Sequence, residues 1–236
     1  MKYAKIAEQS RAAEIATLYY SIHLMSKRDT EQISAIDREA FPDQWRPPSS
    51  YQNDLRNEMI RYIIACDDSK TVSTPEAALE EIPTGIIPSI RQWFAHSTAG
   101  REAATPGDRF ITGYASVWVI TDEAHITNIA VRRQYQRQGI GELLLINTVE
   151  QAREMGADTL TLEVRVSNTG AQALYSKYDF AEAGLRRGYY TDNHEDGLIM
   201  TTASINSTSF QKHFQQLKQE HARRWGLDYS HPGKGG

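Results

Sequence analysis

The strongest chemical signal in the sequence is a glycine-containing turn between an expected strand, 124–131, and an expected helix, 139–155. The turn reads Arg132-Arg133-Gln134-Tyr135-Gln136-Arg137-Gln138-Gly139-Ile140-Gly141. The first turn of a helix offers backbone N–H groups without intrahelical acceptors, at the positive end of the helix dipole. Glycines let a ligand approach the backbone closely, and three arginines add positive charge. The arrangement predicts a phosphate site, with a tight helix start that binds nothing as the alternative.

Two common phosphate motifs do not match this turn. The dinucleotide fingerprint needs a third glycine three residues after the second, and that position holds Leu144. The ATP P-loop needs Gly-Lys-Ser/Thr, whereas Gly141 is followed by Glu142. A different phosphate-bearing ligand is therefore expected.

The spacing Gln136-x-x-Gly139-x-Gly141 after a strand resembles the coenzyme A pyrophosphate loop of the GNAT acetyltransferases, Gln/Arg-x-x-Gly-x-Gly/Ala. Further matching segments follow in the family's order: Asn128-Ile129-Ala130-Val131, Leu162-Glu163-Val164-Arg165, Ser167-Asn168, Ala173-Leu174-Tyr175, Arg186-Arg187-x-Tyr189-Tyr190 and Glu195-Asp196-x-x-Ile199-Met200. The set is similar to the RimI branch, the ribosomal-protein-alanine N-acetyltransferases. The resemblance is close over residues 122–202 and weaker over residues 22–66.

The resemblance implies how acetyl-CoA would be held, without a metal. Backbone groups of the strand around Ile129, Ala130 and Val131 would hold the pantetheine arm. Asn168 would contact coenzyme A while also capping a helix. Main-chain groups of the turn would hold the pyrophosphate, and the residues concerned are Gln136, Arg137, Gln138, Gly139, Ile140, Gly141 and Glu142.

Amine acetylation needs a neutral amine, a polarised thioester carbonyl and a proton for the departing thiolate. By resemblance Glu163 is the general base, and Tyr175 is the general acid and a coenzyme A contact. The residues alone favour a solvated strand glutamate at Glu163 and a helix-core position for Tyr175. The acceptor entrance is implied near Trp45, Tyr189 and Tyr190, for which ordinary packing is the alternative.

These residues need a mixed α/β (α+β) scaffold to position them, and the resemblance implies the GNAT fold. That fold is a mostly antiparallel sheet with helices on both faces and a splayed central strand pair that binds CoA. Hydrophobic periodicity predicts the following elements: strands at 21–26, 61–66, 109–120, 124–131, 159–166, 180–190 and 197–203, and helices at 1–20, 30–40, 51–58, 139–155, 169–178 and 207–225.

The expected organisation is one acetyltransferase domain, 21–204, flanked by a helical N-terminal extension, 1–20, and a helical tail, 205–236. Residues 67–108 read as a surface insertion, because four of the eight prolines lie there among Ser, Thr, Gly and Asp. Neither the extension, the insertion nor the tail has a counterpart in the resemblance.

Composition excludes several classes of protein. The sequence contains no run of 18 apolar residues, so no membrane span is expected. No signal peptide is recognisable either, so a cytoplasmic protein is expected. The net charge of -4 argues against nucleic-acid binding through bulk positive charge. Seven scattered histidines and the lone Cys66 predict neither a metal site nor a disulfide. Cys66 lies in an apolar run, and we expect a buried, structural thiol.

The predicted function is acetylation of a protein N-terminus of the Ala or Ser type, with a ribosomal protein as a candidate acceptor, by direct transfer in a ternary complex. One alternative is the same chemistry on a small-molecule amine or a lysine side chain, which fold and CoA loop cannot separate. Another is a CoA-binding adaptor without turnover.

Overall fold

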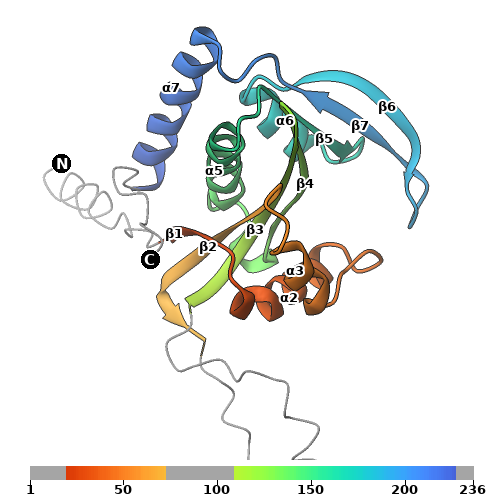
Figure 1. Ribbon diagram of the computed structural model, residues 1–236, viewed down its shortest axis with the longest axis vertical. Coiled ribbons are helices and arrows are strands. Elements are labelled where there is room, and N and C mark those ends of the chain that lie inside the picture. Colours follow the sequence, from red (N-terminus) through yellow and green to blue (C-terminus); the bar gives the residue numbers. More distant parts are fainter. Residues whose placement is uncertain (1–19, 73–108, 227–236) are drawn as a thin grey trace, which may run out of the picture.

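A computed structural model of the protein describes residues 20–72 and 109–226. Seven strands form one sheet in the order β1-β2-β3-β4-β5-β7-β6 (Figure 1). All neighbours pair antiparallel except β4 and β5, which pair parallel. The strands are β1 (Tyr20–Leu24), β2 (Ile60–Thr71), β3 (Arg109–Ile120), β4 (Glu123–Val131), β5 (Thr159–Arg165), β6 (Ala181–Tyr190) and β7 (Glu195–Thr201). The predicted α/β fold with a mostly antiparallel sheet is confirmed.

Helices cover both faces of this sheet (Figure 1). One face carries α5 (Ile140–Glu154), α6 (Thr169–Lys177) and α7 (Thr208–Trp225). The other carries α2 (Thr30–Ala40) and α3 (Pro48–Asp54). Short 3₁₀ turns, η1 (Lys27–Asp29) and η2 (Arg133–Tyr135), precede α2 and α5.

Alternation along the strands divides the apolar side chains between two cores. On β3, Ala115 and Val117 face the α5 core, while Tyr114 faces the α2 core. In β4 a bulge at Thr127 shifts the register with β3, so that Ile126 and Ile129 both pack toward the α5 core. A bulge adds one unpaired residue and increases the local twist, which suits a place where a strand must leave its neighbour.

The parallel pairing of β4 with β5 is short. It runs through Glu123↔Thr159, Ala124↔Leu160 and His125↔Thr161, and no pairing between the two strands follows. Beyond His125 the edge of β4 that faces β5 is left open, which is the splayed pair predicted from the resemblance.

Three details of the predicted elements are wrong. The helix expected at 51–58 is α3, Pro48–Asp54, which starts earlier because Pro48 occupies a first-turn position where its fixed φ favours a helix. Val166, expected as the last residue of the strand 159–166, lies beyond β5, which ends at Arg165, and is 47% exposed. Residues 67–71, expected in the insertion, extend β2.

The tail beyond residue 204 is part of the main core where it is described. Phe210, Phe214 and Leu217 of α7 are buried with the residues of α5 and the sheet, on the helical stripe that the sequence predicts. The predicted helix at 1–20 lies outside the described residues except for Tyr20 in β1, and so do 73–108 of the insertion and 227–236 of the tail. Within the described ranges, no helix is long and apolar enough to cross a membrane.

Candidate active site

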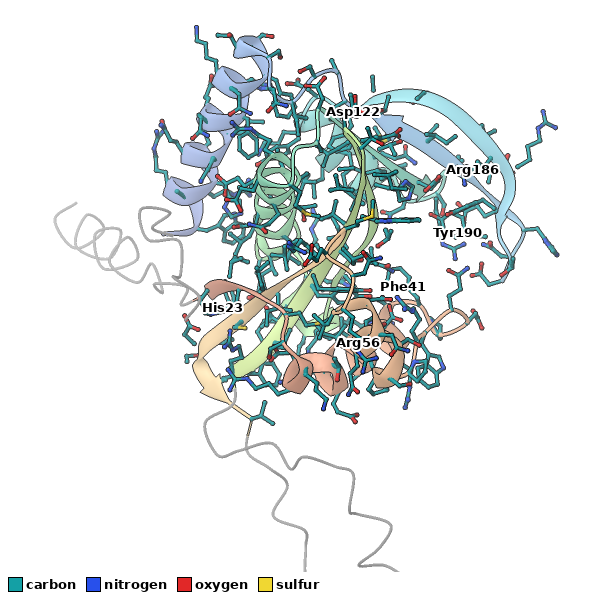
Figure 2. The ribbon with its side chains drawn as sticks, viewed as in Figure 1. His23, Phe41, Arg56, Asp122, Arg186 and Tyr190 are labelled. Carbon is teal, nitrogen blue, oxygen red and sulfur yellow. The ribbon has the colours of Figure 1, made fainter. Side chains whose placement is uncertain are left out.

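A cleft of about 560 Å³ opens where β4 and β5 part. Its floor is formed by 126–129 of β4 and 162–165 of β5. Phe41 and its neighbours after α2 line one side, and Tyr189 and Tyr190 at the end of β6 line another. Figure 2 labels Phe41, which follows α2, and Tyr190, at the end of β6, and both line the cleft. Asn168, before α6, and Tyr175, on α6, also line the cleft, as do Ser167 and the β6–β7 turn residues Asp192, Asn193 and Glu195.

Glu163 is held in this cleft by the nitrogen atoms of two side chains, His125 and Arg186. Its side chain is only 4% exposed. Its Oε2 lies 3.0 Å from Nε2 of His125, and its Oε1 lies 3.1 Å from a terminal nitrogen of Arg186. A buried carboxylate needs such partners, because burial without them strongly disfavours the charge. Glu163 is therefore not the solvated strand glutamate that the sequence left open.

Tyr175 lies half-buried on α6, with its ring 5.8 Å from that of Phe180. Burial, with a smaller contribution from Tyr190, raises the pKa of its phenol to about 12. The hydroxyl therefore keeps its proton at neutral pH. Because thiols of the cysteine type have a pKa near 8.5, the proton can reach a thiolate only in concert with its departure.

The turn before α5 has the geometry of an anion site. The first intrahelical bond is donated by the Leu143 amide to the Gly139 carbonyl, so the amides of Ile140, Gly141 and Glu142 precede it and have no intrahelical acceptor. Arg137 and Gly139 have φ values of 62° and 79°. A left-handed arginine is strained, and strain of this kind concentrates at ligand-binding turns.

Side chains of the turn are engaged with the protein. Gln136 Nε2 donates to the Val131 carbonyl at 3.1 Å, and Gln138 Oε1 accepts from the Tyr20 hydroxyl at 2.8 Å. The Glu142 carboxylate accepts from Lys177 at 2.6 Å and from Tyr178 at 2.7 Å. Burial acts to raise the pKa of Glu142, but these two bonds hold it below its usual value. The negative charge in the helix's first turn is thus balanced by Lys177.

The main-chain groups at the start of α5 and along β4 fit coenzyme A. The α5 amides suit a pyrophosphate, and the open edge of β4 beyond His125 suits the amides of a pantetheine arm. On β4, the Ala130 side chain is buried toward the α2 core, whereas Ile129 and Val131 pack toward α5. Asn168 Oδ1 accepts from the Ala171 amide at 3.2 Å, which makes it a helix cap as predicted, and it also lines the cleft.

Of the three residues expected near the acceptor entrance, two line the cleft and one does not. Tyr189 and Tyr190 line the cleft in a T-shaped pair with ring centroids 5.1 Å apart. Trp45 is 38% exposed and carries Arg38 4.3 Å above its ring, and it lies just beyond the lining segment 40–44. Phe41, four positions before Trp45, lines the cleft that Trp45 was expected to flank.

The far side of the cleft is fixed by Arg165, a residue the sequence did not single out. Its guanidinium contacts both carboxylate oxygens of Asp192, at 3.0 and 2.9 Å, and Glu195 at 3.3 Å, and it stacks 3.9 Å from the Tyr190 ring. Hydrogen bonds from Ser167 are the main reason that the pKa of Glu195 is lowered to about 2. The β6–β7 turn therefore stays tied to β5 down to acidic pH.

A model of the acetyltransferase (GNAT) family matches residues 30–180. The chain belongs to this family. Among its relatives, the ribosomal protein bS18–alanine N-acetyltransferase of Escherichia coli K12 is 42% identical over 110 residues, 42% of this chain and 74% of the relative. A Bacillus subtilis protein provisionally named for the same reaction is 48% identical over 93 residues, 39% of this chain. That match spans only 62% of the Bacillus protein's length.

Solved structures agree with this GNAT assignment. The crystal structure of the Escherichia coli ribosomal-protein-S18-alanine N-acetyltransferase matches with a TM-score of 0.55 and 26% identity, covering 80% of this chain and 97% of that one. Arabidopsis thaliana NAA60, solved with a bisubstrate analogue, matches with a TM-score of 0.58 over 80% of this chain and 99% of that one. Its 17% identity supports the fold alone.

Cys66 allows a direct test of whether the GNAT site uses a cysteine relay. The thiol is fully buried in the α2 core, away from the cleft lining, and burial raises its pKa to about 12. Such a thiol is a poor nucleophile. We expect Cys66→Ala to retain the kcat of the wild type and to lower the free energy of unfolding by about 1 kcal/mol. Acetyl transfer and thermal unfolding measure the two effects, and an inactive but folded Cys66→Ala would contradict direct transfer.

Proposed function

We propose that this protein transfers the acetyl group of acetyl-CoA directly to the N-terminal amine of a protein in a ternary complex. The observation that supports it best is that a buried carboxylate, Glu163, and a protonated phenol, Tyr175, line one cleft beside an anion-binding helix start. These groups supply the base, the acid and the cosubstrate site that the reaction requires.

The proposed steps use each group once. The amine reacts in its neutral form, which is readily available because its free pKa is about 7.7–8.0. As the amine nitrogen bonds to the acetyl carbonyl carbon and the carbon–sulfur bond breaks, Glu163 takes the proton that the nitrogen loses. Tyr175 gives its proton to the sulfur as it leaves. Before the next turnover Glu163 releases its proton to solvent and the tyrosinate takes one up.

The acceptor we propose is an N-terminus of the Ala or Ser type, with a ribosomal protein as the candidate because the relatives in Escherichia coli and Bacillus subtilis carry that name. We further propose action in the cytoplasm, without direct contact to nucleic acid or membrane and without a metal. Within the described parts of the chain, no group of three metal-ligating side chains was found.

The test is thiol release from acetyl-CoA with short peptides that begin with Ala, Ser or Met, each with an acetyl-blocked twin. Turnover on free Ala or Ser termini and none on their blocked twins would support the proposal. Lysine peptides and polyamines run alongside test the same chemistry on other amines. Binding of CoA without turnover on any amine would instead indicate an adaptor.

A further inference from the structure

The wall of the cleft that follows α2 is anchored at both ends to one residue, Asp37. This wall is the segment 41–46; its residues 41–44 line the cleft, and Phe41 is labelled in Figure 2. The main-chain carbonyl of Asp37 accepts from the Phe41 amide at 2.7 Å, and its side-chain Oδ2 accepts from the Arg46 amide at 2.9 Å. A single α2 residue therefore fixes both the start and the end of the segment.

The Asp37 carboxylate is itself held in place. The residue is 2% exposed, and its Oδ1 accepts from the hydroxyl of Tyr114 on β3 at 2.6 Å. Burial, together with the charge of Asp37, raises the pKa of the Tyr114 phenol well above its usual value, so the hydroxyl remains a donor. Hydrogen bonds to an ionised acceptor are roughly twice as strong as those between neutral groups. Asp37 thus ties the end of the segment to an interior strand of the sheet.

Ser34, one turn earlier on α2, supports the same end of the segment. Its hydroxyl donates to the Arg46 carbonyl at 2.8 Å, so both main-chain polar groups of Arg46 are paired with α2 side chains. The Arg46 guanidinium pairs with Asp54 of α3 at 2.8 Å, which holds its side chain rather than its backbone. Between the two ends, the part of the chain that the structure describes shows one further main-chain bond, from the Gln44 amide to the Phe41 carbonyl at 3.0 Å. The residues that line the cleft therefore depend on the end anchors for their position.

We propose that Asp37 is a positioning residue for the acceptor: its carboxylate sets where the wall 41–44 stands against the bound peptide, without lining the cleft itself. The inference rests on the proposed function, because it takes this wall as an acceptor contact. Glu163 and Tyr175 stand on β5 and α6, and the turn proposed for the pyrophosphate precedes α5. Loss of Asp37 should therefore weaken acceptor binding and leave the chemistry and the cosubstrate site unchanged.

The experiment compares Asp37→Ala and Asp37→Asn with the wild type on a short peptide with a free N-terminal Ala or Ser. Asp37→Ala leaves the Arg46 amide without its acceptor. We expect the KM for the peptide to rise at least about tenfold, with kcat and the calorimetric Kd for CoA unchanged.

Asp37→Asn tests whether the hydrogen bond is what matters. The asparagine oxygen can still accept from the Arg46 amide, and the Tyr114 hydroxyl can rotate to accept from the asparagine nitrogen. This variant should therefore keep the peptide KM within about threefold of the wild type. A rise in Asp37→Asn equal to that in Asp37→Ala would contradict positioning through the bond to Arg46.

Ser34→Ala keeps the proposal testable if Asp37→Ala does not fold. It removes one hydroxyl and leaves the buried carboxylate with both of its partners. Loss of the bond to the Arg46 carbonyl should raise the peptide KM about two- to fivefold, again without a change in kcat or in the Kd for CoA.

The matched control is Asp29→Ala. Asp29 is 3% exposed, lies directly before α2 and accepts from the Ser26 amide at 2.7 Å, but it neither lines the cleft nor contacts the wall. Its loss should lower the free energy of unfolding and leave the peptide KM unchanged.

An Asp37→Ala variant with a wild-type peptide KM would overturn the proposal, or a Ser34→Ala variant with a wild-type KM if Asp37→Ala does not fold. A loss confined to kcat or to CoA binding would overturn it as well. A wild type that binds CoA but acetylates no peptide would instead contradict the proposed function itself.

Discussion

Replacing Glu163 with glutamine is expected to lower kcat by about 10²- to 10³-fold and to leave the affinity for coenzyme A unchanged. Glutamine has nearly the same shape, and its amide oxygen can still accept a hydrogen bond from Arg186, but it cannot take the amine's proton. The turn before α5, which we propose as the pyrophosphate site, is separate from this carboxylate, so CoA binding should persist.

Two measurements check this expectation, initial rates with an acceptor peptide and calorimetric titration with CoA. Glu182→Gln is the matched control, because Glu182 is an exposed glutamate on strand β6 of the same sheet and does not line the cleft. A Glu163→Gln variant that keeps wild-type kcat would remove Glu163 as the base, and equal losses of turnover and CoA binding would indicate a distorted site.

Replacing Gly139 with alanine should raise the Kd for CoA by more than about tenfold, at a cost of a few kcal/mol in the turn. Two effects combine. Gly139 has φ +79°, which costs an L-residue about 1–2 kcal/mol. A Cβ there would also lie 2.4 Å from Nε1 of the Trp225 indole. His221 Nε2 also contacts the Gly139 carbonyl at 3.0 Å, so α7 confines the turn from a second side. The turn must therefore shift away from the amide geometry that we propose for pyrophosphate binding.

Gly141→Ala is the control, since a Cβ at Gly141 meets nothing within 4 Å and its φ is not in the left-handed region. It should bind CoA normally. The double variant Gly139→Ala/Trp225→Ala separates the two effects, because it relieves the contact and keeps the backbone strain. If Gly139→Ala binds CoA as tightly as Gly141→Ala, the turn is not the pyrophosphate site.

Much of the fold was predictable because its signals are local. The alternation of Leu160, Leu162 and Val164 marks β5, and the 3.6-residue stripe of Phe210, Phe214 and Leu217 marks α7. Asn168 begins α6 as a helix cap because its side chain satisfies an amide of the first turn. Element ends were harder to predict, as Val166 and α3 show, because a strand or helix stops where its partners stop.

The candidate site was likewise predictable from the sequence only in part. The turn from Gln136 to Gly141 and the positions of Glu163 and Tyr175 could be read from the sequence together with the family resemblance. The partners of Glu163 could not, because His125 and Arg186 come from two other strands and carry no local pattern that singles them out. Arg165 was likewise visible only as an outward-facing strand residue, until the fold placed Asp192 and Glu195 around it.

What the sequence by itself determined is which segments become strands, helices and the glycine turn, because side-chain periodicity and backbone freedom act over a few residues. What only the tertiary structure decided is where the sheet opens, which charges surround Glu163 and what lies against Gly139. Those facts depend on pairing between distant strands and on the docking of α7, since burial makes the electrostatics of a carboxylate depend on whichever residues the fold brings within about 4 Å.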